Sequence, residues 1–172
     1  MKKVILIGYM GSGKSIIARE LAKYKSIKYV DLDDLIVENS GMSVKNFFIQ
    51  KGELSFRKME HQLFSEKLKD KSGIIISTGG GTPCYFNNYK LYENDNCISI
   101  YLKASIETLY NRLNNEVNER PLLANLNENE VKEFIAKQLF ERSYYYNKAL
   151  KVVVVDNKSV IEIVSEINDL LS

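Results

Sequence analysis

The segment from Gly8 to Ser15, with the sequence GYMGSGKS, has the residue types and spacing of a phosphate-binding loop. It follows the short apolar run at 4–7 and precedes a stretch at 16–22 that has helical character. In such a strand–loop–helix unit, backbone N–H groups converge on phosphate oxygens at the positive end of a helix dipole. Lys14 would reach the β- and γ-phosphates, and the Ser15 hydroxyl would bind Mg²⁺. A chance match is the alternative, but the flanking strand and helix argue against it, so the motif predicts that the chain binds a nucleoside triphosphate.

Three aspartates, Asp31, Asp33 and Asp34, follow the apolar run at 28–30. Because residues two apart in an extended segment point the same way, we expect Asp31 and Asp33 to face a cleft together. One carboxylate suits Mg²⁺, which keeps several waters and takes only one or two protein carboxylates, and the other could bind a substrate hydroxyl. Helix capping is the competing interpretation, and we expect one of the three aspartates to cap a helix, with Asp34 as the first choice.

Arg57 and Glu60 lie on a predicted helix at a spacing that makes them neighbours. A solvated ion pair is the ordinary outcome of this spacing. The alternative is that Glu60 orients the guanidinium group of Arg57 so that it binds an anion at two points. His61, the only histidine in the chain, lies on the same helix, and we assign it no role.

Three consecutive glycines, Gly79, Gly80 and Gly81, follow the apolar run at 73–76. Glycine is costly because it loses more backbone entropy on folding than other residues, and a tight turn would need only one or two. The triplet therefore indicates a backbone that approaches a ligand closely and donates its N–H groups.

The stretch at 114–129 is rich in Asn and Glu and has little periodicity. A solvated surface loop is one interpretation. The other is a lid, because structureless loops of this length in compact domains are often functional. Arg120, which is followed by Pro121, favours the lid.

Apolar, β-branched runs alternate along the chain with segments of helical spacing. This alternation predicts βαβ units, and therefore an α/β fold in which a five-stranded parallel sheet lies between two helical layers, with the ligand site at the carboxyl ends of the strands. The final helix is predicted at 159–171. Asp156 ends an apolar run that looks like a Mg²⁺-binding motif, but we interpret it as the exit from the last strand, close to where a base would lie. The predicted strands are 4–7, 28–30, 73–76, 97–102 and 151–155.

Composition places the 172-residue chain among single-domain globular proteins, with 45% hydrophobic and 27% charged residues. A net charge of +2, from 24 basic and 22 acidic residues, gives no electrostatic case for a nucleic acid or membrane partner. No apolar stretch approaches the length of a membrane span. Cys84 and Cys97 lack metal or redox spacing, so we expect free thiols in a reducing compartment and a cytoplasmic enzyme.

Taken together, these segments resemble the shikimate kinases, small P-loop kinases of the nucleoside monophosphate kinase fold, over essentially the whole chain. The resemblance implies transfer of the γ-phosphoryl group of ATP to the 3-hydroxyl of shikimate, on the route to chorismate and the aromatic amino acids. It implies one kinase domain over 1–172, with a core at 1–32, 73–111 and 130–172, a substrate-binding helical segment at about 33–72 and a lid at about 112–127. The motifs that carry it are GYMGSGKS, DLD at 31–33, FRKME at 56–60, STGGG at 77–81, RPLL at 120–123, and Arg142 ahead of Tyr146.

The same resemblance implies a role for each matching residue on the nucleotide side. Lys14 and Arg120 would act on the phosphoryl group, Arg112 would pack against adenine, and Asp31 would hold Mg²⁺ through water, together with Ser15. The ATP-binding residues would be Gly11, Ser12, Gly13, Lys14, Ser15, Ile16, Arg112 and Arg120.

On the acceptor side, the resemblance implies that Asp33 binds the hydroxyls of shikimate and accepts the proton. Arg57, Arg142 and the backbone of Gly79–Gly81 would bind the carboxylate of shikimate. We expect a monomer that binds neither nucleic acid nor membrane.

Two other functions remain possible at this point. A gluconate or nucleotide kinase of the same fold is one, although two arginines and a triple glycine suit a carboxylated acceptor and argue against a nucleoside monophosphate. Gluconate also has a carboxylate, so only the complete set of motifs argues against it. The other is a nucleotide-dependent switch module, which would not need the second anion-binding cluster.

Overall fold

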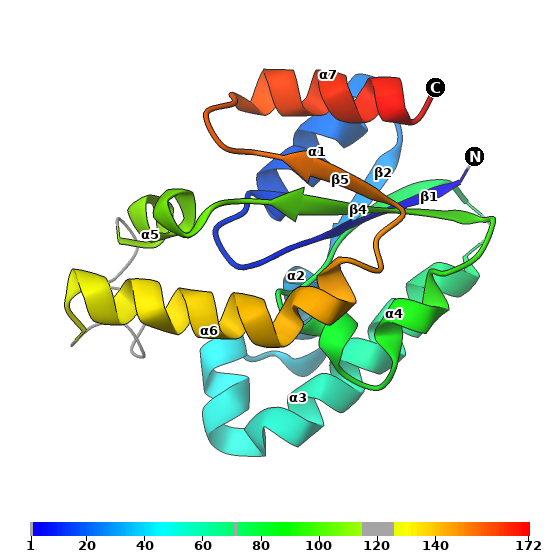
Figure 1. Cartoon of the computed structure of the whole chain (residues 1–172). Helices are drawn as coiled ribbons and strands as arrows, with labels where there is room; N and C mark the ends of the chain where they lie inside the picture. Colours follow the sequence, from blue (N-terminus) through cyan, green and yellow to red (C-terminus); the bar gives the residue numbers. More distant parts are fainter. Residues whose placement is uncertain (1, 71, 115–125) are drawn as a thin grey trace.

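The computed structural model describes residues 2–70, 72–114 and 126–172 (Figure 1). Strands and helices alternate as predicted, and each strand begins and ends within one residue of its predicted position. The elements in order are β1 (Lys3–Ile7), α1 (Lys14–Lys25), β2 (Lys28–Asp31), α2 (Leu32–Ser40), α3 (Val44–Lys69), β3 (Ile74–Ser77), the 3₁₀ turn η1 (Thr82–Cys84), α4 (Asn88–Leu91), β4 (Cys97–Lys103), α5 (Ile106–Asn114), α6 (Glu128–Tyr146), β5 (Lys151–Val154) and α7 (Val160–Leu170).

The five strands form one parallel sheet in the order β2-β3-β1-β4-β5. Helices α1 and α7 cover one face of the sheet, and α3, α4 and α6 lie on the other side (Figure 1). This arrangement confirms the predicted α/β fold with a five-stranded parallel sheet between two helical layers. Because all strands run the same way, the loops after β1, β2 and β3 emerge at one edge of the sheet.

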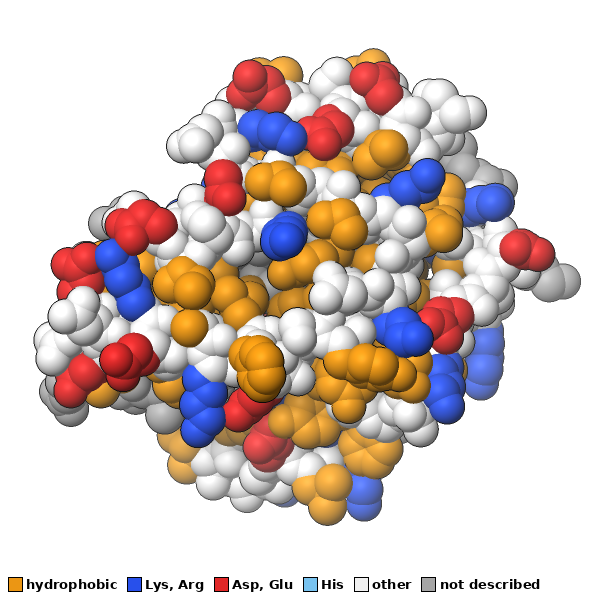
Figure 2. Space-filling model, in the orientation of Figure 1, with side chains coloured by type: hydrophobic (Ala, Val, Ile, Leu, Met, Phe, Trp, Pro, Cys, Tyr) orange, Lys and Arg blue, Asp and Glu red, His pale blue; other side chains and the backbone are white. Residues whose placement is uncertain are grey.

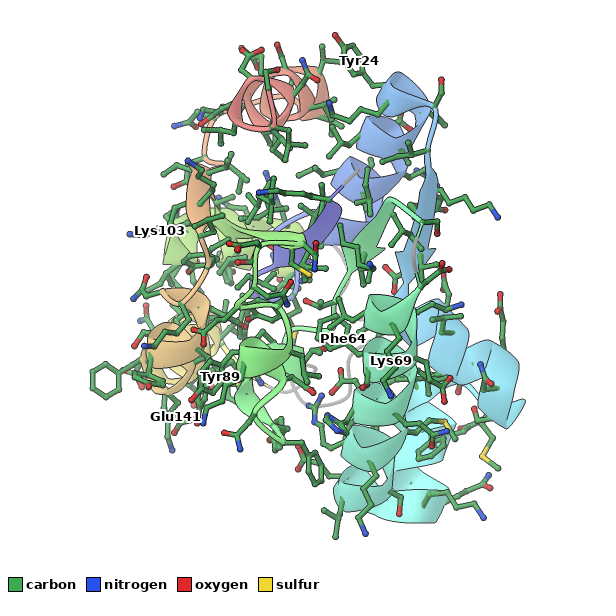
Figure 3. All side chains as sticks on the ribbon, turned by 90° about the vertical axis from the view of Figure 1, so that its right-hand side faces the viewer. Tyr24, Phe64, Lys69, Tyr89, Lys103 and Glu141 are labelled. Carbon is green, nitrogen blue, oxygen red and sulfur yellow. The ribbon has the colours of Figure 1, made fainter. Side chains whose placement is uncertain are left out.

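The main core lies on both faces of the central strands. All residues of β1 and β3 are buried, as expected for parallel strands that are covered on both sides. Phe64 of α3 is fully buried in this core, whereas Tyr24 of α1 is 66% exposed (Figure 3). The packed centre therefore fixes the positions from which the loops at the carboxyl edge depart.

A second, smaller core joins α2 and α3. It contains Ile36, Phe47, Phe56 and Leu63. Helix α3 is interrupted at Gly52, where φ is 77° and ψ is 166°, a backbone conformation that is essentially restricted to glycine. The part of α3 that follows this interruption carries Arg57 and Glu60.

The edge strand β5 and its neighbours expose hydrophobic side chains. Figure 2 shows hydrophobic side chains on the face formed by α6, β5 and α7, where Phe140, Val152, Val154 and Ile161 are exposed. Strand β5 is short and begins with the exposed Lys151, and both features oppose pairing with the edge of another sheet. Among the helices described here, none has the length and apolar character needed to cross a membrane.

The last helix begins and ends close to its predicted position at 159–171. Ser159 caps α7 through a capping box, in which its hydroxyl accepts from the N–H of Glu162 and the Glu162 carboxylate accepts from the N–H of Ser159.

Candidate functional site

A cleft of about 900 Å³ lies at the carboxyl edge of the sheet. It is lined by the loop between β1 and α1, the end of β2, parts of α2 and α3, the glycine triplet, and residues of α5, α6 and α7. Arg120 and most of the predicted lid lie outside the described residues. The other predicted site residues all line this cleft: Gly11, Ser12, Gly13, Lys14, Ser15, Ile16, Asp31, Asp33, Arg57, Gly79, Gly80, Gly81, Arg112 and Arg142.

The loop between β1 and α1 needs glycine at two positions. Gly11 and Gly13 have φ values of 81° and 95°, which side-chain-bearing residues rarely adopt. Helix α1 begins directly afterwards at Lys14, so its first N–H groups lie at the cleft. The Lys14 ammonium donates to the carbonyl oxygen of Tyr9 at 2.9 Å, and Arg112 Nη1 donates to that of Gly11 at 3.1 Å. Both cations are thus held beside the loop.

Ser15 and Asp31 are brought together as the sequence predicted. The Ser15 hydroxyl donates to Asp31 Oδ2 at 2.6 Å, which links the start of α1 to the end of β2. These two hard oxygen groups beside the loop between β1 and α1 are of the kind that suits Mg²⁺, which binds few protein groups and keeps its waters. Within 2–70, 72–114 and 126–172, no group of three or more His, Cys, Asp or Glu side chains is placed to hold a metal ion.

The aspartates follow a different local structure from the one expected. Helix α2 begins at Leu32, immediately after β2, so Asp33 lies in a first helical turn and not in an extended segment. Asp31, and not Asp34, caps this helix, because its Oδ1 accepts from the backbone N–H of Asp33 at 2.9 Å. One of the three aspartates does cap the helix, but the prediction that it is Asp34 is wrong. The prediction that Asp31 and Asp33 lie in one extended segment, and face the same way for that reason, is also wrong. Asp31 and Asp33 nevertheless line the same cleft, because the helix starts at its edge.

The carboxyl group of Asp33 is strongly perturbed by its surroundings. Burial, followed by the nearby carboxylates of Asp31 and Glu60, raises the pKa of Asp33 to about 6, although Lys14 and Arg57 act in the opposite direction. A carboxylate with this pKa is ionised at neutral pH and can still accept a proton, which is the property required of a general base.

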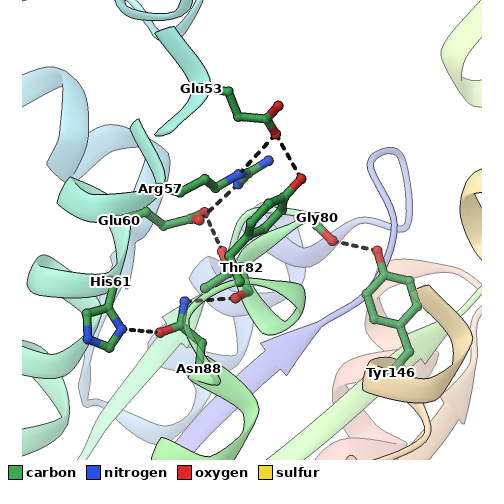
Figure 4. A network of polar contacts seen from close by, with 9 residues as sticks. Glu53, Arg57, Glu60, His61, Gly80, Thr82, Asn88 and Tyr146 are labelled. Atoms are coloured by element: carbon green, nitrogen blue, oxygen red, sulfur yellow. Dashed lines mark hydrogen bonds and ion pairs between the residues drawn. The ribbon is translucent and has the colours of Figure 1, made fainter. Parts of the chain in front are cut away.

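Arg57 and Glu60 form a buried ion pair, which excludes the solvated alternative. Arg57 Nη1 donates to Glu60 Oε2 at 2.9 Å, and Glu60 is 0% exposed (Figure 4). The guanidinium carbon lies 4.4 Å from the centroid of the Tyr85 ring. Glu53 Oε1 lies 3.6 Å from Arg57 Nε, which is buried and makes no hydrogen bond within the described part of the chain. Arg57 thus lines the cleft with two carboxylates, those of Glu60 and Glu53, beside its guanidinium group.

The glycine triplet lies in a turn closed by a hydrogen bond from the Thr82 N–H to the Gly79 carbonyl oxygen, and close packing explains the lack of a side chain at Gly79 and Gly81. None of the three has a positive φ. A Cβ atom on Gly79 would lie 2.7 Å from Glu60 Oε1, and one on Gly81 would lie 2.6 Å from Arg57 Nη2. The absence of side chains thus lets the ion pair lie against this backbone. Whether the N–H groups of the triplet also bind a ligand stays a prediction.

Helix α6 connects the two ends of the cleft. The Tyr146 hydroxyl donates to the carbonyl oxygen of Gly80 at 2.6 Å (Figure 4), and the hydroxyl of Tyr9 in the phosphate-binding loop donates to Gln138 Oε1 at 2.9 Å. Arg142, between these two contacts on α6, lies with its guanidinium carbon 5.4 Å from the Tyr9 ring centroid. One helix therefore positions an arginine between the loop and the glycine triplet.

Several residues that line the cleft were missed by the sequence analysis. Val44 and Phe48 of α3 were not singled out, because apolar residues in a helical segment are usually core. Lys158 and Val160, which lie just beyond the last strand, also line it. The sequence analysis did expect the nucleotide base to lie near this exit loop, but it considered only Asp156 there.

Asp156 has a structural role. Its carboxylate accepts from the backbone N–H of Ser105 at 2.9 and 3.2 Å. Burial acts to raise the pKa of Asp156, but hydrogen bonds from Thr108 and Ser105 outweigh it, so the pKa lies below its usual value. The carboxylate thus ties the end of β5 to the segment that precedes α5.

Both cysteines are free thiols, as predicted. Burial raises the pKa of the Cys84 thiol to about 11, which keeps it protonated and makes it a poor nucleophile.

Comparisons with known proteins agree with this geometry. A family model described as shikimate kinase matches residues 10–172. The shikimate kinase of Flavobacterium johnsoniae is 52% identical over 172 residues, which is 100% of both chains. The crystal structure of shikimate kinase from Bacteroides thetaiotaomicron superimposes with a TM-score of 0.90 at 28% identity, covering 99% of this chain and 98% of that one. Shikimate kinase from Acinetobacter baumannii in complex with shikimate has the same fold, with a TM-score of 0.88 at 23% identity over 99% of this chain and 93% of that one.

Proposed function

The chain belongs to the shikimate kinase family, and we propose that it transfers the γ-phosphoryl group of ATP to the 3-hydroxyl of shikimate. Its product would enter the route to chorismate and the aromatic amino acids. The observation that carries this proposal is the presence in one cleft of a phosphate-binding loop and a buried arginine–glutamate pair, with Asp33 lining the same space. This arrangement suits a triphosphate and a carboxylated alcohol side by side.

On the nucleotide side, Lys14 and the first N–H groups of α1 would neutralise the phosphates. Arg112 would pack against adenine, near Lys158 and Val160. Mg²⁺ would be held by Ser15 and, through water, by Asp31, and would supply positive charge to the phosphate oxygens. Because phosphoryl transfer needs little covalent chemistry from the protein, these charges and their placement account for most of the catalysis.

On the acceptor side, Arg57, Arg142 and the Gly79–Gly81 backbone would bind the carboxylate of shikimate. Asp33 would then hydrogen-bond the reacting hydroxyl and accept its proton. The pKa of about 6 supports this role, because the group is ionised at neutral pH and basic enough to receive a proton.

Other parts of the proposal concern the organisation of the molecule. The segment at about 33–72 would bind the substrate, and a lid at about 112–127 would bring Arg120 to the phosphates and exclude water. The short edge strand β5, which begins with an exposed lysine, supports a monomer, and two free thiols support a cytoplasmic location.

An assay of ADP release with a panel of acceptors tests the function. The panel contains shikimate, gluconate, a nucleoside monophosphate and no acceptor. We expect turnover with shikimate to exceed that with every other acceptor by orders of magnitude, and to require Mg²⁺. Equal turnover with gluconate would favour the related small-metabolite kinase, and slow hydrolysis without dependence on any acceptor would favour a switch module.

A further inference from the structure

We propose that Thr82 and Asn88 are positioning residues for the acceptor site: they hold Glu60, and through it Arg57, in the orientation that binds the carboxylate of the acceptor. This inference rests on the proposed function. Neither residue is among the described residues that line the cleft, so each would act through another side chain.

Glu60 is held by one donor on each carboxylate oxygen. Arg57 Nη1 donates to Oε2 at 2.9 Å, and the Thr82 hydroxyl donates to Oε1 at 2.5 Å (Figure 4). Both Glu60 and Thr82 are 0% exposed. Water therefore cannot replace the threonine hydroxyl without a rearrangement, and a short hydrogen bond to a buried carboxylate is among the stronger kinds in proteins.

Thr82 is held in turn by a second buried residue. Asn88 Nδ2 donates to the Thr82 carbonyl oxygen at 2.8 Å, and Asn88 is 0% exposed. Because a carbonyl can only accept, this contact fixes the orientation of the Asn88 amide and turns its Oδ1 towards His61. His61 Nδ1 lies 2.6 Å from that oxygen and must carry the proton (Figure 4). The histidine thus ends a chain of directed contacts that begins at Arg57.

These hydrogen bonds matter because Arg57 must present its planar guanidinium group in one orientation. Two-point binding of a carboxylate depends on the plane of the guanidinium group, which Glu60 sets by occupying Nη1. Without the Thr82 hydroxyl, Oε1 loses its donor and the carboxylate can turn about its last bond. The positive charge of Arg57 would remain in place, but its orientation would no longer be fixed.

The test compares Thr82→Val, which removes the hydroxyl at nearly constant volume, with Thr82→Ser, which keeps it. We expect Thr82→Val to raise KM for shikimate about tenfold, as the loss of one hydrogen bond to a charged group predicts, with KM for ATP and kcat unchanged within about twofold. Thr82→Ser should stay within about threefold of the parent protein. Asn88→Ala should raise KM for shikimate by a smaller factor, about threefold, because it acts through Thr82.

Two further measurements separate positioning from general stability. Ser99→Ala is the matched control, since Ser99 is also a buried hydroxyl and accepts from the Leu150 N–H at 2.9 Å in another part of the sheet. It should lower the melting temperature without changing KM for shikimate. In an Arg57→Lys background, Thr82→Val should have no additional effect on KM, because the group that it orients is gone.

The outcomes distinguish this inference from the proposed function. If the parent protein does not phosphorylate shikimate, both fail. Suppose that the parent protein is active and that Thr82→Val folds. If this variant then keeps the parent KM for shikimate, or raises the KM values for shikimate and ATP equally, the positioning role is overturned and the proposed function stands. Should Thr82→Val not fold, Thr82→Ala and Thr82→Ser decide the matter by the same comparison.

Discussion

At the scale of single residues, Asp33 shows how a functional site can reduce stability. Its pKa of about 6 means that the native state holds a proton more tightly than the unfolded chain, in which the carboxyl group has its ordinary pKa of 3.8. As pH rises from about 4 to about 6, the native state therefore loses stability relative to the unfolded chain, and above pH 6 the loss is complete. A shift of this size corresponds to about 1–3 kcal/mol.

We therefore predict that Asp33→Asn stabilises the protein above pH 6. The gain in unfolding free energy should be about 1–3 kcal/mol at pH 8. It should vanish near pH 3, where the carboxyl group of Asp33 is protonated in the native and the unfolded state alike. Urea titrations at a series of pH values measure it. Asp169→Asn, on the exposed surface of α7, controls for the loss of one negative charge. A pH-independent gain would contradict the raised pKa.

Catalytic activity should rise as Asp33 ionises, whereas stability falls. Because Asp33 must be ionised to accept the acceptor's proton, kcat/KM for shikimate should fall about tenfold per pH unit below pH 6. A pH–rate profile of the parent protein measures this directly. A flat profile between pH 5 and pH 7 would remove Asp33 from the role of base.

Arg57→Lys tests the carboxylate site while conserving charge. A lysine cannot reproduce the planar two-point contact, so we predict that KM for shikimate rises about 10- to 100-fold while KM for ATP changes little. An acceptor analogue without the carboxylate should bind the parent protein poorly and respond little to the substitution. Equal losses with both acceptors would show that Arg57 serves the fold or ATP.

At the scale of elements, the interruption of α3 at Gly52 links backbone strain to the site. No atom lies within 4 Å of a Cβ built at Gly52 or at Gly41, so substitution is limited by backbone conformation and not by space. Gly41 has φ 68° and ψ 14°, a left-handed conformation that alanine can reach, whereas the φ of 77° and ψ of 166° at Gly52 are nearly exclusive to glycine.

We predict that Gly52→Ala lowers the unfolding free energy by about 1–3 kcal/mol, and that the matched control Gly41→Ala lowers it by about 1 kcal/mol. Gly52→Ala should also raise KM for shikimate, because Arg57 lies little more than one helical turn after the interruption. Denaturant titrations and initial-rate kinetics measure the two effects. Equal stabilities for the two variants would show that α3 can relax around Gly52.

At the scale of the whole molecule, the spacing of the motifs and the alternation of strands with helices along the chain were sufficient to predict the sheet and most of the residues that line the cleft. The identity of the helix cap after β2 was not predictable in this way, because it depends on where the helix begins, and the cap is Asp31, three residues before the predicted Asp34. The contact of Asn88 with Thr82 and His61 joins helices α3 and α4 across 27 residues and leaves no periodic signal. Phe48 was hidden for another reason, since an apolar residue on a helix looks the same whether it lines a core or a cleft.

The division of the cleft into two binding regions gives a prediction for the stability of the entire protein. A ligand that binds only the native state stabilises it by about 2.7 kcal/mol at 100 times its dissociation constant. For a domain of this size, that corresponds to a rise of about 5–10 °C in melting temperature. We predict that ADP with Mg²⁺ and shikimate each produce such a rise. Lys14→Ala should abolish the response to ADP and keep that to shikimate, because it removes a charge from the phosphate-binding loop alone.

Arg57→Lys should give the reverse pattern, with a weakened response to shikimate and a normal response to ADP. The two variants control for each other, since each removes or replaces one buried cation in the same cleft. Thermal unfolding followed by circular dichroism, with each ligand alone and with both, provides the measurement. If either variant lost both responses to the same extent, the phosphate-binding loop and the arginine–glutamate pair would belong to a single binding site, and the assignment of separate nucleotide and acceptor regions would be wrong.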